Sequence, residues 1–254
     1  MLNKFNAYYI KLDLLDIPGD PPDLFPCGVS PLDSFEMSFN SLSQIVSAFE
    51  YNFLNVDKTV EICFIGLISY FEAFCKDQFA TLINICPELI SDLKKRGHDV
   101  MIDASHTVSH KNVFYRILGP LLTEKYNFTT SKQINSNFRA LLNLSPFSKE
   151  EAKRYDEILN ERNLIVHHGG IYTMKYLEQC KTRDDINAYW GSVAIQEWDY
   201  FDIALMIVKI VAKIVTSTEK ALRNYIETNK INLDDDQRMA LKILGSPFTI
   251  ESTP

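Results

Sequence analysis

The chain has 254 residues, 46% of them hydrophobic and 23% charged, which is enough apolar material for one large globular domain. Only 9 glycines and 10 prolines are present, so the composition excludes a loop-rich all-β protein and a disordered chain. A protein that holds long nucleic acid by general electrostatics is normally basic, whereas the formal net charge here is −7. Any contact with RNA is therefore expected to use a small positive pocket on an acidic body.

Residues 1–30 are predicted to form an irregular N-terminal arm. Four prolines between residues 16 and 26 forbid a helix there, because proline lacks the backbone N–H that a helix needs. The segment from Tyr8 to Leu14 is expected to be either a short strand or a stretch of chain laid over the core.

Residues 31–254 are predicted to form a single all-α domain, a helical bundle. Proline is well tolerated at the first helical position, so Ser30-Pro31 indicates a helix start. Apolar residues recur every three or four positions after Asp57, a candidate N-cap, and Gly119-Pro120 is expected to end a weaker helix. Helices are expected over residues 31–51, 58–85, 99–118, 131–143, 148–168, 197–228 and 234–245, with a short one ending near residue 95 and a less regular stretch over 171–196.

Cysteine spacing and the length of apolar runs indicate the cellular compartment in which the protein is expected. The five cysteines show no CxxC spacing or metal-ligand pattern, so we expect reduced, buried thiols and neither a metal nor a cofactor. The N-terminus lacks the basic-then-apolar pattern of a signal peptide. The most apolar run, residues 201–215, is interrupted by three charged residues and predicts a buried helix rather than a membrane span. A cytoplasmic protein without a membrane partner is expected.

The most informative segment, residues 161–170, reads ERNLIVHHGG. It lies at the end of the helix that begins after Ser148, and the two glycines are expected to stop that helix. Asn163 and His167 are four residues apart and share a helix face, whereas Arg162 and His167 lie roughly 140° apart around the axis. The length of the arginine side chain, together with a distorted last turn, is expected to close much of that gap. Arginine holds phosphate through paired donors, and histidine transfers protons near neutral pH.

With Arg162, Asn163 and His167, the chain resembles the HEPN family of all-α domains, in particular the large stand-alone type similar to the RiboL-PSP-HEPN-like group. The family signature is an arginine, a polar residue and then a histidine, and four residues separate Arg162 from His167 here. The preceding segment, residues 65–77 (IGLISYFEAFCKD), looks like the long first helix of these domains, which often carries an aromatic-Glu-x-Phe sequence. The resemblance covers about residues 40–230.

The resemblance implies a metal-independent endoribonuclease, usually a homodimer, that acts as a toxin or an antiviral-defence effector with an antitoxin or defence-system partner protein. His167 would act as general acid or base at the ribose 2′-hydroxyl or the leaving 5′-oxygen, and Arg162 would stabilise the phosphorane-like transition state. Asn163 would orient the histidine or the substrate. His168 is an additional candidate outside the family pattern, and Glu72 is expected to support the motif from the preceding helix. The dimer interface is expected on the helices over 58–85 and 148–168.

Plainer interpretations compete with these roles. Arg162 would form an ordinary ion pair with Glu72 or with an acidic residue of its own helix, and the two histidines would only cap the helix end. The alternative function is a HEPN-like module that binds RNA, a nucleotide or a protein without cleavage, which the acidic charge favours. His98, His106 and His110 are candidate metal ligands by residue type, but we expect them to form part of a polar surface.

Overall fold

A computed structural model describes residues 8–12, 23–26, 28–48, 58–109, 111, 113–179, 191–246 and 248–252. The all-α prediction is confirmed: within these ranges the chain forms ten helices and one small two-stranded sheet. The expected N-cap Asp57, the prolines from 18 to 22 and His110 lie outside the described residues.

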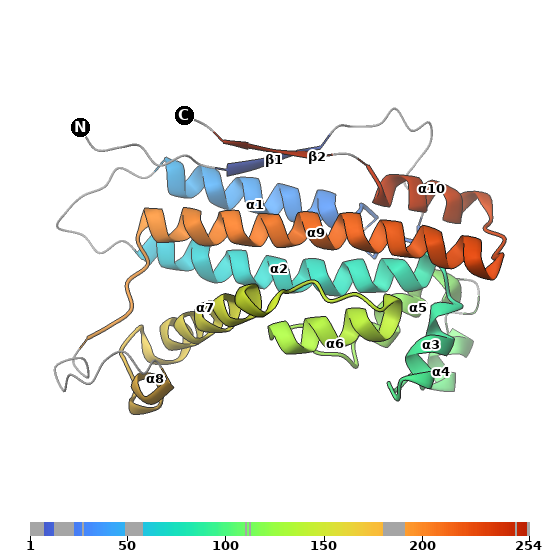
Figure 1. Ribbon diagram of the computed structural model, residues 1–254, viewed down its shortest axis with the longest axis horizontal. Helices are drawn as coiled ribbons and strands as arrows, with labels where there is room; N and C mark the ends of the chain where they lie inside the picture. The colour runs from blue at the N-terminus through green and yellow to red at the C-terminus, as the bar shows by residue number, and fades with distance from the viewer. Residues whose placement is uncertain are drawn as a thin grey trace.

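Three long helices lie side by side along the long axis of the molecule: α1 (Pro31–Ser47), α2 (Lys58–Ile85) and α9 (Glu197–Asn229) (Figure 1). The helix α2 is buried on several of its faces, because it packs against α1, α9 and several shorter helices at once. Phe64, Leu67 and Phe71 on α2 are fully buried, as is Ile207 on α9. The core of the protein therefore runs along α2.

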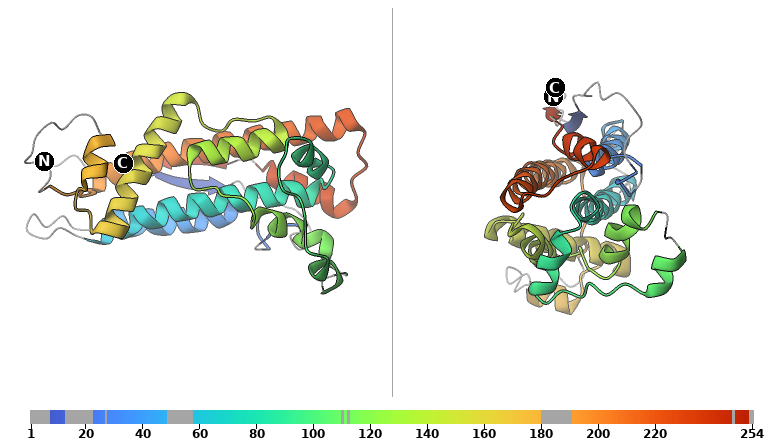
Figure 2. Two further views of the ribbon diagram at one scale, coloured as in Figure 1. Left: turned by 90° about the horizontal axis from the view of Figure 1, so that it is seen from below. Right: turned by 90° about the vertical axis from the view of Figure 1, so that its right-hand side faces the viewer.

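The shorter helices gather on one side of these three long helices (Figure 2). They are α3 (Leu89–Lys95), α4 (Ala104–Ser109), α5 (Phe114–Thr123), α6 (Ser131–Leu142), α7 (Lys149–His168) and α8 (Met174–Gln179). The helix α10 (Asp235–Leu244) lies on the other side, near the sheet (Figure 1). Ser30, Thr130, Ser148 and Asp234 cap α1, α6, α7 and α10 through capping boxes, which confirms the start predicted for α1 and the capping box predicted for α7.

The sheet joins the two ends of the chain. Strand β1 (Tyr8–Leu12) pairs antiparallel with β2 (Phe248–Ser252), with Ile10 opposite Ile250. Of the two options for the N-terminal segment, the strand is the one that forms, whereas a partner strand after residue 247 was not predicted. The side-chain amide of Asn40 on α1 exchanges hydrogen bonds of 3.0 and 2.9 Å with the backbone N–H and C=O of Ile10. This contact fixes the strand on the bundle.

The prediction of one helix from 99 to 118, ended by Gly119-Pro120, is wrong. The structure has two helices there, and α5 continues through both residues. Pro120 cannot donate to the carbonyl of Arg116, and the Asn84 side-chain Nδ2 donates to that carbonyl instead at 2.8 Å. The Asn84 Oδ1 accepts from the backbone N–H of Gly119 at 2.8 Å. A buried amide on α2 thus completes the helix that proline would otherwise interrupt.

Candidate functional site

The helix α7, which carries the candidate motif, is attached to α2 by aromatic packing. The ring of Tyr155 lies 5.4 Å from the ring of Phe71 on α2 and 5.0 Å from that of Phe147, which precedes α7. Phe147 and Phe71 pack edge to face at 6.1 Å. Such aromatic pairs add about 0.5–1.5 kcal/mol each beyond the area that they bury. The position of α7 on the bundle is therefore set by this three-ring cluster.

Polar contacts tie α7 to two further helices. Asp156 Oδ1 accepts a hydrogen bond of 2.9 Å from the hydroxyl of Ser131, at the start of α6. Glu151 Oε2 receives the Lys213 ammonium of α9 at 2.5 Å and also accepts from the backbone of Ser148 at 2.7 Å. With neighbours on α2, α6 and α9, α7 is a fixed element on which side chains can be held in place.

The C-terminal end of α7 is closed by the two glycines, as predicted. Gly169 and Gly170 have φ angles of 59° and 85°, in the region that side chains disfavour, and both backbone N–H groups donate to the carbonyl of Leu164. Gly170 then pairs with Val193, whose N–H donates to the Gly170 carbonyl at 2.8 Å. A Cβ atom at Gly170 would lie only 2.9 Å from the Val193 oxygen. The chain leaving the motif is therefore held against residues 191–193.

A groove of about 190 Å³ lies between the end of α7 and the α8 segment. Asn163 and His167 both line it, so the structure brings these two predicted site residues together as their four-residue spacing indicates. The second histidine of the motif also lines the groove. Its lining comprises Asn160, Asn163, Leu164, His167, His168, Thr173, Lys175 and Tyr176. This set contains one lysine and two histidines but no carboxylate, in a chain of net charge −7.

Arg162 is not among the groove-lining residues. Its side chain is half-buried, and its Nε is buried without a hydrogen-bond partner among the described residues. Its Nη1 donates to the Oδ1 of Asn163 at 3.0 Å. The guanidinium is therefore connected to the groove through the Asn163 amide, while its Nε atom is enclosed by protein.

Glu72 and Tyr155 share this enclosed side with Arg162. Burial raises the pKa of the Glu72 carboxyl, and the positive charge of Arg162 offsets part of that effect. Burial also raises the pKa of the Tyr155 hydroxyl well above its ordinary value. Glu72 Oε1 and the Tyr155 hydroxyl are both buried without a hydrogen-bond partner in the part of the chain that the structure describes. The predicted link from Glu72 to the motif thus takes the form of an electrostatic interaction with Arg162.

No ion pair within 4 Å joins Arg162 to a carboxylate among the described residues, so its interaction with Glu72 is not a direct salt bridge. A guanidinium that is partly desolvated and only partly paired is costly for the fold. Perturbed, incompletely satisfied polar groups are more frequent at functional sites than elsewhere.

The other candidate residues lie away from the groove. His98 packs edge to face against Tyr126 at 5.5 Å, and His106 is exposed on α4. Within the described ranges, no three His, Cys, Asp or Glu side chains are placed to hold a metal ion. The described cysteines, Cys63, Cys75 and Cys86, are buried. None of the described helices has the length and apolar character needed to cross a membrane.

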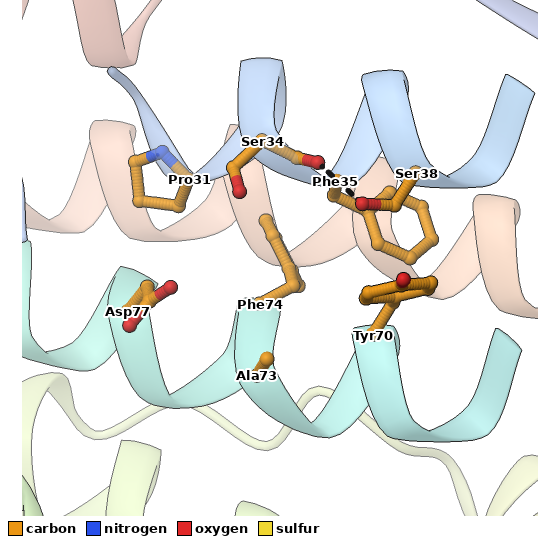
Figure 3. A pocket seen from close by; sticks show the side chains of 8 residues that line it. All are labelled: Pro31, Ser34, Phe35, Ser38, Tyr70, Ala73, Phe74 and Asp77. Atoms are coloured by element: carbon orange, nitrogen blue, oxygen red, sulfur yellow. Dashed lines mark hydrogen bonds between the residues drawn. The ribbon is translucent and has the colours of Figure 1, made fainter. Parts of the chain in front are cut away.

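A second pocket lies between α1 and α2 (Figure 3). Its volume of about 20 Å³ has room for roughly one water molecule. Asp77 is at one end, where burial raises the pKa of its carboxyl and Lys76 offsets part of the rise. The Ser38 hydroxyl, at the other end of the pocket near Tyr70, already donates to the Ser34 carbonyl at 3.1 Å (Figure 3). This pocket is part of the packing between two helices and presents no group aimed at a ligand.

Comparison with protein-family models, with curated proteins and with solved structures finds no match for this chain.

Sequence reasoning found the α7 side of the groove but not the α8 side. Asn160 is three residues before Asn163 and seven before His167, so helical periodicity places it on the same face. Thr173, Lys175 and Tyr176 carry no comparable signal, because their position depends on how the chain turns after Gly170.

Proposed function

We propose that this protein is a metal-independent endoribonuclease. It would cleave RNA by promoting attack of a ribose 2′-hydroxyl of the RNA on the adjacent phosphate. The observation that carries the proposal is the contact between Arg162 and Asn163, on the wall of a groove that His167 also lines. The groove contains positive or neutral polar side chains on an acidic protein, which suits a phosphate group. The sequence resemblance to HEPN domains supports the same chemistry.

In this proposal His167 exchanges protons with the reacting oxygens. The 2′-oxygen forms a bond to phosphorus as its proton leaves to a base, and the bond from phosphorus to the 5′-oxygen breaks as that oxygen receives a proton. The products are a 2′,3′-cyclic phosphate and a 5′-hydroxyl. His167 performs one of the two proton transfers, and His168, exposed in the same groove, is available for the other.

Arg162 supplies positive charge for the transition state, in which the phosphoryl oxygens gain negative charge. Its link to Asn163 connects that charge to the groove, and Glu72 and Tyr155 surround it on the buried side. Asn163 thus bonds to Arg162 and lines the same groove as His167. Positive charge that is already partly desolvated interacts more strongly with a phosphate than a hydrated surface arginine does.

We also propose a homodimer that uses the exposed end of α7. Val166 is 45% exposed, Ile171 60% and Met174 60%, so three apolar side chains surround the motif. Most of α2, the other expected interface helix, is buried within its own chain. A dimer that covers this apolar surface would bring two motifs together. Ile171→Asp is expected to convert a dimer to a monomer in light scattering, and a wild-type protein that is already monomeric would contradict the proposal.

The nuclease is tested with labelled oligoribonucleotides and total RNA in the presence of EDTA. Wild-type protein is expected to cleave and leave a cyclic phosphate, and His167→Ala is expected to lose at least about a hundredfold in rate. His106→Ala is the matched control because His106 is exposed on α4. An oligonucleotide with deoxyribose throughout should resist cleavage. Absence of cleavage by folded wild-type protein across many RNAs would reject the proposal.

The biological role that we propose is that of a toxin or antiviral-defence effector, controlled by an antitoxin or defence-system partner protein. Its test is growth of cells after induction of the gene. Wild-type protein is expected to arrest growth, and the His167→Ala variant at equal abundance is not.

The alternative is a non-catalytic module that binds RNA, a nucleotide or a protein. It is favoured by the position of Arg162, whose Nε is buried, whose charge acts on Glu72, and which does not line the groove. In that case wild-type protein would bind oligoribonucleotides without cleaving them, and His167→Ala would change affinity alone.

A further inference from the structure

The wall of the groove opposite the motif helix is formed by the segment from Thr173 to Tyr176. Thr173, Lys175 and Tyr176 line the groove together with His167 and His168. The expected motif chemistry assigns no role to this wall, although it contributes the one lysine among the groove-lining residues.

This wall is held in place by its own contacts. The Tyr176 ring stacks on the buried Tyr172 ring, with centroids 5.3 Å apart and planes 5° from parallel. The Thr173 hydroxyl accepts the backbone N–H of Tyr176 at 3.2 Å, which caps the start of the segment. Tyr172 is fixed in turn by its backbone N–H, which donates to the Gly191 carbonyl at 3.1 Å. The aromatic ring is therefore supported before any ligand arrives.

We infer that this wall is a binding subsite for the RNA nucleotide next to the phosphate that reacts. Lys175 contacts a backbone phosphate, and Tyr176 packs against the base or sugar of that nucleotide. Binding single-stranded RNA commonly combines a positive groove with aromatic rings on which bases stack. The inference rests on the proposed function in one respect, which is that the ligand is RNA whose scissile phosphate lies at His167.

The size and charge of the groove suit a single nucleotide of an RNA strand. Pockets that enclose a drug-sized ligand hold about 300–1,000 Å³, whereas this groove holds about 190 Å³ and is open to solvent. Lys175 and both histidines are exposed, so a longer strand has access from outside. The absence of carboxylates from the lining set removes the repulsion that a phosphate would meet over most of this acidic surface.

The test separates binding from cleavage by the choice of probe. A fluorescent oligoribonucleotide with 2′-O-methyl riboses has no attacking hydroxyl, so its anisotropy reports binding alone. Lys175→Ala is expected to raise its Kd at least about fivefold, and to lower the dependence of log Kd on log salt by about 0.7, one phosphate contact. Lys153→Ala is the matched control, because this substitution removes the same charge. The Lys153 side chain is 81% exposed on α7 and lies outside the groove. It should stay within twofold of wild type.

A second pair of variants examines the ring. Tyr176→Phe should keep the affinity within twofold, because stacking on Tyr172 survives, and Tyr176→Leu should weaken it about threefold or more. With cleavable RNA, Lys175→Ala should raise KM and leave kcat within about twofold, whereas His167→Ala lowers kcat.

The possible outcomes distinguish the two proposals. Cleavage that needs His167 but is unaffected by Lys175→Ala, in both Kd and KM, would overturn the subsite and leave the nuclease standing. Binding that needs Lys175 without cleavage of any RNA would support the subsite and reject the nuclease. Equal weakening by Lys175→Ala and Lys153→Ala would show only general charge attraction and would overturn the subsite. No binding by folded wild-type protein would reject both.

Discussion

Arg162 Nη1 donates a hydrogen bond of 3.0 Å to Asn163 Oδ1, between side chains of consecutive residues on α7. Consecutive helical residues point about 100° apart, so this bond turns the arginine toward the groove face. The arginine, whose Nε is buried, is thereby bonded to a residue that lines the same groove as the two histidines.

That relationship predicts the effect of Asn163→Asp. A carboxylate there would pair with Arg162 and add negative charge to the groove, which should weaken oligoribonucleotide binding about tenfold and reduce any cleavage. Asn163→Gln keeps an amide and is the control. Fluorescence anisotropy at fixed salt measures the effect, and equal affinity for the Asp and Gln variants would show that Asn163 does not shape the site.

The contact of α5 with α2 predicts a large cost for Gly119→Ala. A Cβ atom there would lie 2.1 Å from the Ala80 carbonyl oxygen, a backbone atom that cannot move aside alone. We expect a loss of about 3 kcal/mol or more in the free energy of unfolding. Gly66→Ala is the matched control, because its Cβ would meet only side-chain atoms, those of Leu42 at 3.4 Å and of Tyr70 at 3.9 Å. It should stabilise the helix by up to about 1 kcal/mol. Urea denaturation followed by circular dichroism measures both, and similar results for the two would contradict the packing argument.

We predict that the Asn84 side chain makes a large contribution to the free energy of unfolding. Asn84→Ala leaves the carbonyls of Leu24 and Arg116 and the N–H of Gly119 without their partner, which should cost about 2–4 kcal/mol of unfolding free energy. Pro120→Ala restores an N–H opposite the Arg116 carbonyl. The double variant should therefore lose less stability than the sum of the single variants. Additive losses in the urea-denaturation cycle would indicate that Asn84 does not replace the missing proline donor.

The burial of Glu72 predicts a pH effect on stability. Its pKa is raised in the folded protein, so the folded state binds its proton more tightly than the unfolded chain does. The associated stability is fully present below the unfolded-state pKa and is lost as pH rises through the folded-state pKa. Glu72→Gln removes this loss, so its stability relative to wild type should increase as pH rises through that range. Thermal melts of both proteins between pH 4 and 8 give this difference, and a difference that is constant with pH would contradict the buried-carboxylate argument.

Helix boundaries in this protein follow local chemistry closely. Ser148 and Glu151 form the capping box that begins α7, and Gly169 ends the helix in a left-handed conformation. These features act within one turn of chain, so sequence reasoning placed the motif helix correctly. It failed at Gly119-Pro120, where the donor that replaces the proline N–H belongs to Asn84, 35 residues before Gly119.

The sequence by itself determined the all-α class, the ends of the motif helix and the shared face of Asn163 and His167, because helical periodicity and capping depend on residues a few positions apart. Only the tertiary structure decided that Arg162 lies next to Glu72 and that Lys175 completes the groove. Both depend on which surfaces pack together after the chain has turned back on itself. The burial of apolar area drives that packing, and because it is non-directional, the local sequence pattern does not specify which surfaces meet.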